Sequence, residues 1–259
     1  MRIIDLSSPV DASGWEPDPV NHRVMTPAEG AAHCASEMRE HFGLEISPAD
    51  FPGGEFLNND FLELSTHTGT HVDAPAHYGS KAEYGDGRPR TIDELPLDWF
   101  HRPGVVLDLT HLPSGAVDAA EIDKALARIG YRPQPLDIVL LHTGADERSG
   151  TLEYFTRFAG LDESATDYLL DLGIRVIGTD AFSLDAPFTH IVEEYQRTGD
   201  QKVLWPAHMA GRRREFCQIE RLAGLGSLPR PFGFTVSALP VKVKGAGAGW
   251  ARAVALVED

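Results

Sequence analysis

The chain has 259 residues, of which 42% are apolar and 24% charged, and its formal net charge is −16. This composition is typical of a globular protein with a sizeable hydrophobic core, and it excludes a disordered or fibrous chain. The acidic balance also disfavours nucleic acid and anionic membrane surfaces as partners, because the averaged field repels polyanions at long range.

Short apolar or β-branched runs predict seven strands, and the chain shows no internal repeats. Several of these runs are continuously apolar, which is typical of buried strands. The predicted strands are residues 2–6, 60–66, 104–109, 137–143, 174–179, 233–239 and 250–257.

Capping residues and terminal glycines predict three helices between these strands. The predicted helices run from Thr26 to Gly43, from Asp118 to Gly130 and from Asp185 to Gly199. Strands that alternate with helices in this way indicate a layered α/β fold. No linker is long enough to divide the chain, so we expect one domain over residues 1–259. The glycine-containing segment Tyr78–Arg90 is predicted to be a surface loop.

The two cysteines, Cys34 and Cys217, do not form a CxxC pair and are too few for a disulfide framework. This usage favours a reducing, cytoplasmic location. The first residues predict a strand and not a signal peptide. A membrane-spanning helix is not expected either, because no run of about 18 apolar residues occurs.

The most informative stretch is residues 67–77, which contains His67, His71 and His77 together with Asp73. Random placement of the chain's 11 histidines would put about half of one in these 11 residues. Neutral imidazoles and a carboxylate are the ligands that Zn²⁺, Mn²⁺ or Fe²⁺ prefers. The alternative is a loop whose histidines form hydrogen bonds with neighbouring backbone, but the clustering favours a metal site.

This stretch matches the pattern His-x-Gly-Thr-His-x-Asp-x-Pro-x-His at every fixed position. At this motif the chain resembles the metal-dependent cyclase and kynurenine formamidase family. Segment Gly178–Asp185 is similar to the family's Gly-x-Asp-x-x-Ser-x-Asp segment, and His208 with Glu220 is similar to its distal ligand pair. The resemblance covers nearly the whole chain. It implies a single mixed α/β domain, with a central mixed sheet or half-barrel flanked by helices, and at least a homodimer.

The resemblance also implies a role for each residue of the motif. His67, His71 and Asp73 would bind one divalent cation, and Asp73 would bridge to a second site formed with His208 and Glu220, which gives one or two Zn²⁺ or Mn²⁺ ions per subunit. His77 is left as the proton-transfer residue. The implied metal ligands are His67, His71, Asp73, His208 and Glu220.

Residues 15–20 with the helix that follows, and segments 204–208 and 217–220, are similar to the family's aromatic polyketide branch. This similarity implies a cyclase in secondary-metabolite biosynthesis that closes a ring by aldol condensation and dehydration, with His77 as the base. The alternative is a metal-dependent hydrolase of an aryl formamide or a cyclic amide. A metal-binding scaffold without turnover is a third alternative. The ligands alone fit both reactions, and either substrate is a small molecule.

Four further residues are candidate substrate contacts. Tyr78 and Trp205 are close in sequence to His77 and His208, and core packing is the alternative role for these aromatic rings. Asp180 and Ser183 follow a predicted strand, where clefts are often lined, and helix or loop capping is the alternative for them.

Overall fold

A nine-stranded mixed sheet is the centre of the structure, a computed structural model that describes residues 1–258. Strands β5, β7, β9 and β10 run parallel to one another, and the strands on either side of them pair antiparallel. In spatial order the strands are β1 (Arg2–Asp5), β13 (Val254–Val257), β11 (Phe232–Ser237), β5 (His101–Asp108), β7 (Ile138–His142), β9 (Val176–Thr179), β10 (Cys217–Glu220), β4 (His71–Asp73) and β12 (Ala248–Trp250).

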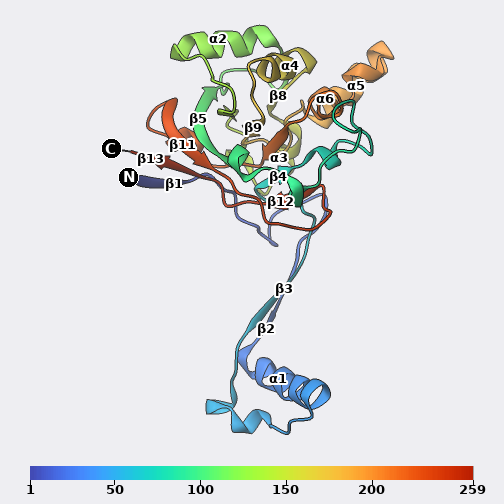
Figure 1. The fold of residues 1–259 in the computed structure, drawn as a ribbon, viewed down its shortest axis with the longest axis vertical. Coiled ribbons are helices and arrows are strands. Elements are labelled where there is room, and N and C mark those ends of the chain that lie inside the picture. Colours follow the sequence, from blue (N-terminus) through green and yellow to red (C-terminus); the bar gives the residue numbers. More distant parts are fainter. Residues whose placement is uncertain (259) are drawn as a thin grey trace. The chain divides into compact units, whose positions relative to one another are not determined.

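Helices cover one face of this sheet, and the sheet curls into a half-barrel around a second core (Figure 1). The covering helices are α2 (Ala119–Ile129), α4 (Glu163–Asp171) and α6 (Pro206–Arg213), with α3 (Leu152–Thr156) and α5 (Phe188–Thr198) beside them. Alternate residues of a strand face opposite sides, so Leu107 packs in the helix-covered core while Val106 packs in the other. The predicted α/β fold with a central mixed sheet or half-barrel is confirmed.

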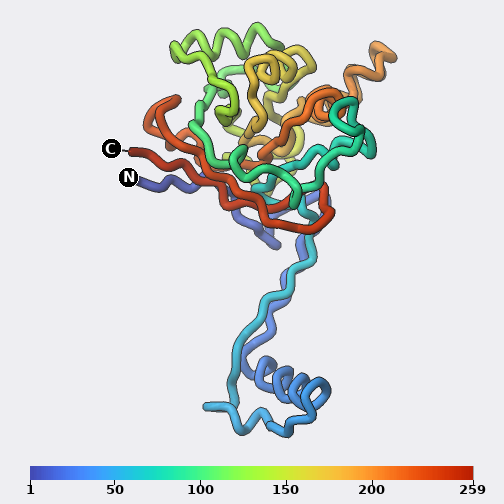
Figure 2. Tube along the Cα trace, in the orientation of Figure 1, coloured from blue at the N-terminus to red at the C-terminus, as the bar shows by residue number. Residues whose placement is uncertain are grey.

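Chain ends that are far apart in sequence lie side by side, as the trace in Figure 2 shows. Strand β1 pairs antiparallel with β13, and Arg2 lies opposite Val257. A small parallel sheet of β6 (Gly115–Val117) and β8 (Ala159–Leu161) lies outside the large sheet.

Residues Glu16–Ser65 form a separate compact unit. It contains the antiparallel pair β2 (Asn21–Met25) and β3 (Asn59–Glu63) and the helix α1 (Pro27–Phe42). The other unit comprises Met1–Trp15 and the chain from Thr66 onward. The expectation of one domain over residues 1–259 stays a prediction. No helix among the described residues is long and apolar enough to cross a membrane.

Each predicted strand corresponds to an observed one, with shifted ends. The predicted strand 250–257 was wrong in extent, because residues 251–253 separate β12 from β13. Five strands were not predicted, since they are short or polar: β2, β4, β6, β8 and β10.

Two local predictions need correction. The helix expected from Asp185 begins at Phe188, because the Asp185 carboxylate is engaged by the backbone of another helix, α6. Tyr78 is not part of an exposed loop: its side chain is 2% exposed and its ring stacks on Phe216.

Candidate metal centre

Strands β4 and β10 bring three of the predicted ligands to one face of the sheet. Within β4, His71 and Asp73 point to the same side, while Val72 between them packs in the opposite core. Glu220 is the last residue of β10 and lies directly opposite His71 in the antiparallel register. The side chains of such cross-strand partners lie on the same face, so the three ligands converge.

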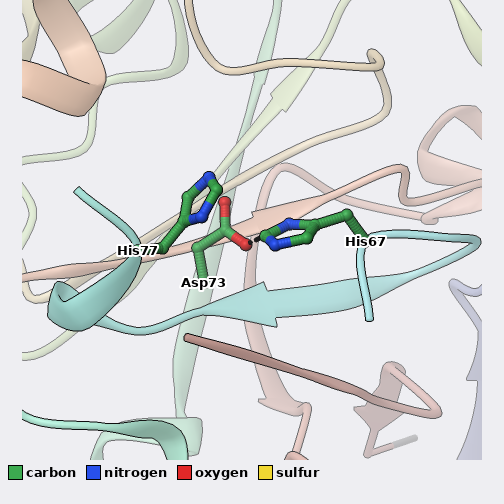
Figure 3. Close-up of side chains that lie close together, drawn as sticks. All are labelled: His67, Asp73 and His77. Carbon is green, nitrogen blue, oxygen red and sulfur yellow. Dashed lines mark ion pairs between the residues drawn. The ribbon is translucent and has the colours of Figure 1, made fainter. Parts of the chain in front are cut away.

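His67 lies in the turn that precedes β4. Gly69 in this turn has a φ of 67°, a left-handed conformation that glycine adopts without a steric penalty. The Thr70 hydroxyl donates to the Arg221 carbonyl (2.6 Å), and Arg221 Nη1 donates to the His67 carbonyl (3.3 Å). These bonds tie the turn to β10. Figure 3 shows the Asp73 carboxylate between the rings of His67 and His77.

Helix α6 supplies His208. The Asp185 carboxylate accepts hydrogen bonds from the backbone N–H groups of Ala207 (2.6 Å) and His208 (3.1 Å) in the first turn of this helix. It also pairs with Nδ1 of His208. This contact fixes the ring so that Nε2 points to Asp73 and Glu220, the arrangement in which a carboxylate orients a metal-binding histidine.

The five predicted ligands lie close together around Asp73. His67 Nδ1 is 3.0 Å from Asp73 Oδ1 and 3.2 Å from His71 Nε2, which is 3.3 Å from the same oxygen and 3.7 Å from Glu220 Oε2. His208 Nε2 is 3.8 Å from Asp73 Oδ2 and from Glu220 Oε1. Ligand atoms about 2 Å from a tetrahedral zinc ion are about 3.3 Å apart.

Nitrogen and oxygen atoms that can donate lone pairs to a cation face one another in this cluster. Both Asp73 oxygens are buried and accept no hydrogen bond from residues 1–258. His71 Nδ1 lies 2.8 Å from the Gly69 carbonyl, to which it donates, so Nε2 presents a lone pair to the cluster. Burying such groups without a partner is costly. The donor set therefore fits a divalent cation.

Charges within the cluster shift the pKa values of its members. Burial opposes protonation of His71, but Asp73 and Glu220 outweigh burial and raise its pKa. For His208, burial is likewise overcome by Asp185, which raises the pKa to about 9. Burial and the nearby Asp73 carboxylate raise the pKa of Glu220. The site thus concentrates negative charge that a cation would neutralise.

His77 lies at the edge of the cluster, at the end of the short helix Pro75–His77. Its ring centroid is 4.2 Å from that of His67 and 5.5 Å from that of His208. One of its nitrogens also lies within 4.8 Å of ligand atoms of His67 and Asp73. Desolvation and the neighbouring imidazoles lower its pKa to about 4, although Asp73 acts in the opposite direction. The position of His77 is therefore compatible with two roles, proton transfer and metal binding.

The four candidate substrate contacts lie in different surroundings. The Tyr78 ring contacts those of His77 and His208, with centroids 6.0 and 5.7 Å away. Trp205 directly precedes α6 and contacts Phe188 edge to face. The other two are buried and act within loops: Asp180 accepts hydrogen bonds from Thr143 and Gly144, and Ser183 accepts one from the Asp185 backbone.

Two residues near the cluster were not predicted from the sequence. Gln218 is fully buried and lies opposite Asp73 in the register, and its carboxamide forms no hydrogen bond with residues 1–258. Arg221 has a φ of 61° and its guanidinium lies 5.6 Å from the centroid of Tyr154. No sequence signal marks Gln218, and the only signal for Arg221 is its position directly after the predicted ligand Glu220.

Sequence comparison finds relatives of this chain among the kynurenine formamidases. The chain is 31% identical over 205 residues to a kynurenine formamidase from Salinibacter ruber, covering 76% of this chain and 79% of the relative. A kynurenine formamidase from Paracidovorax citrulli is 30% identical over 225 residues, covering 83% and 91%.

Solved structures show the same fold. An isatin hydrolase bound to the product analogue thioisatinate has a TM-score of 0.75 at 22% identity, covering 99% of this chain and 92% of that one. Isatin hydrolase A from Labrenzia aggregata has a TM-score of 0.73 at 23% identity, covering 100% and 94%. Residues 4–186 match the Cyclase family, described as "Putative cyclase". The chain belongs to this cyclase family.

Proposed function

We propose that the protein is a metal-dependent hydrolase that cleaves the C–N bond of an aryl formamide or a cyclic aryl amide. The observation that carries this proposal is the buried Asp73 carboxylate, which accepts no hydrogen bond from residues 1–258 and is surrounded by three imidazoles within about 4 Å. The names of the relatives, kynurenine formamidase and isatin hydrolase, support hydrolysis over ring closure.

The family resemblance assigns the five ligands to two ions. His67, His71 and Asp73 would hold one ion, and Asp73, His208 and Glu220 a second. The short distances among these side chains support both sites. A bound divalent cation supplies polarisation of the substrate carbonyl and a lower pKa for water. Nitrogen and carboxylate donors suit both Zn²⁺ and Mn²⁺.

His77 would move the proton. With a pKa of about 4 the ring is neutral near pH 7, so a ring nitrogen accepts a proton from the attacking water. The water oxygen forms the new C–O bond, the C–N bond breaks, and His77 returns the proton to the leaving nitrogen. The products are a carboxylic acid and an amine. Asp185 holds His208 in place throughout.

Ring closure of a poly-β-ketone uses the same residues and stays a prediction from the resemblance. There His77 would remove a proton from the carbon next to a ketone. Because both reactions need the same ligands, a direct comparison of substrates separates them.

The test assays the metal-loaded protein in parallel on N-formylkynurenine, isatin and a poly-β-ketone intermediate. We expect hydrolysis of at least one amide, and we expect His77→Ala to lose this activity while retaining its metal. A matched control is His111→Ala, which changes an exposed histidine that is hydrogen-bonded to Arg128. Ring closure without amide hydrolysis would contradict the proposal.

A further inference from the structure

A pocket of about 590 Å³ opens in the larger unit at the amino-terminal ends of β9 and β10. Glu220, the metal-ligand candidate, lies at the opposite end of β10, five residues after Glu215 in the pocket. At about 3.3 Å per residue, this separation is roughly 16 Å. The pocket is therefore distinct from the metal centre. Its lining residues are Tyr84, Gly85, Asp86, Arg88, Arg90, Arg175, Arg214 and Glu215.

Four guanidinium groups line this pocket, against the carboxylates of Asp86 and Glu215. Such a concentration of positive charge is notable in a chain whose net charge is −16. Glu215 neutralises only one arginine directly, because it forms a bidentate pair with Arg90 at 2.6 Å for each bond.

Arg175 is the cation without an acidic partner. Its Nη1 donates to the backbone carbonyl of Glu215 (2.6 Å), but no carboxylate in residues 1–258 lies within 4.0 Å of its guanidinium. The guanidinium carbons of Arg90 and Arg175 lie 5.2 and 6.0 Å from the centroid of the Trp99 ring. Both guanidinium groups thus lie near the same indole ring, and only that of Arg90 forms an ion pair with a carboxylate among residues 1–258.

The pocket also contains a hydroxyl group that has no hydrogen-bond partner in residues 1–258. The Tyr84 hydroxyl is shielded from solvent and forms no hydrogen bond with any other part of the described chain. Desolvation and the nearby Glu215 raise its pKa to about 12, so the hydroxyl remains a proton donor at neutral pH. Within the described chain, the Tyr84 hydroxyl is therefore a donor without an acceptor, and Arg175 is a cation whose only hydrogen-bond acceptor is a neutral carbonyl.

The remaining two arginines form ion pairs at the surface, and Arg214 also donates to the backbone carbonyl of Asp167 (3.4 Å). Arg88 pairs with Glu94 at 2.8 Å, and Arg214 pairs with Asp171 at 2.6 Å. The Arg88 and Asp171 side chains are 60% and 73% exposed. Exposed pairs contribute little to stability, so both arginines can turn toward an acceptor in the pocket at small cost.

We propose that this pocket binds a small tetrahedral oxyanion of the sulfate or phosphate class, held by the Arg175 guanidinium and the Tyr84 hydroxyl, with Arg88 and Arg214 at the rim. Guanidinium groups match such oxyanions because they donate parallel, charge-assisted hydrogen bonds. This site is independent of the hydrolase proposal, since none of its residues contributes to the metal centre.

The experiment titrates sulfate into the metal-loaded protein by isothermal calorimetry, with ionic strength held constant by sodium chloride. We expect one sulfate per chain, and at least about tenfold weaker binding in Arg175→Gln, as the loss of a charged hydrogen-bond donor predicts. The matched control is Arg132→Gln, which removes the same charge from an exposed position outside this pocket and should bind as the wild type does.

Tyr84→Phe provides a second variant that keeps the ring and removes only the hydroxyl, and we expect it to weaken sulfate binding severalfold. If no sulfate binds, or if Arg175→Gln and Tyr84→Phe bind as tightly as the wild type, the proposal is overturned. Equal weakening by Arg132→Gln would also overturn it, because that result would show general charge attraction.

Discussion

Asp73 contributes two carboxylate oxygens to the centre, and neither accepts a hydrogen bond from residues 1–258. Burial acts to raise the pKa of this carboxyl, but its interactions with His71 and His67 hold the pKa well below its usual range. The residue is therefore an anion that needs a cation. Its motif could be recognised from sequence because the ligands are close together along the chain.

Asp185 acts on the centre only through His208. The variant Asp185→Asn removes the negative charge that fixes the His208 ring. It also removes one of the two oxygens that accept hydrogen bonds from the first turn of α6. We expect metal affinity to fall about 10- to 100-fold, the usual effect of losing such a partner. Competition with a coloured chelator measures this change. The exposed variant Asp98→Asn should leave the affinity unchanged, and an unaltered affinity in Asp185→Asn would refute the positioning role.

The Tyr78 hydroxyl is buried and has no hydrogen-bond partner in residues 1–258. Tyr78→Phe keeps the ring that stacks on Phe216. We therefore expect the free energy of unfolding of the metal-free protein to change by less than about 1 kcal/mol, since no hydrogen bond is lost. Denaturant unfolding measures it, and a much larger loss would show that the hydroxyl has a partner.

At the level of elements, the site depends on strands that the sequence pattern does not reveal. The strand His71–Asp73 has only three residues, and two of them are polar ligands, so no apolar run marks it. Long apolar strands such as Ile138–His142 were predicted because burial on both faces requires continuous apolar sequence. Strands that carry metal ligands therefore lack the apolar pattern by which strands are predicted from sequence.

The helix expected to begin at Asp185 shows a second limit of prediction from sequence. An aspartate followed by a proline is typical of a helix start, but this carboxylate caps α6, which begins some 20 residues later. Local sequence identifies a capping residue without showing which helix it caps.

Helix α6 packs closely against the Tyr78 ring, and this contact can be tested by a substitution in the helix. A Cβ atom at Gly211 would lie 2.0 Å from Cδ2 of the Tyr78 ring, so Gly211→Ala must displace the helix or the ring. We expect a loss of stability of about 1 to 3 kcal/mol, as is common for overpacked cores. Because α6 carries His208, metal affinity should fall as well. Thermal unfolding and chelator competition test both, and a wild-type result in both would contradict this packing.

At the level of the whole molecule, the sequence could not show which distant segments meet. The pairing of β4 with β10 brings Glu220 beside His71, although 148 residues lie between them in the chain. Only the resemblance to a family linked these residues in advance. The cytoplasmic location and the homodimer stay predictions.

The small unit Glu16–Ser65 offers a surface for the predicted homodimer. Its two-stranded sheet is marginal on its own, and it exposes Val24, Phe61 and Leu62 by 50%, 41% and 54%. We expect a dimer in solution that dissociates in the variant Phe61→Glu with Leu62→Glu. Sedimentation or light scattering measures the mass. Leu152→Glu, at another exposed leucine, is the control, and a dimer that survives the double substitution would place the interface elsewhere.

The metal content of the purified protein, compared between the wild type and Asp73→Ala, tests the central claim most directly. Elemental analysis after dialysis should find one or two divalent ions per wild-type chain and almost none in Asp73→Ala. The control His142→Ala, which alters a separate group of His142, Asp146 and Asp180, should retain its ions. Full metal stoichiometry in Asp73→Ala would show that the cation is bound elsewhere and would contradict the account.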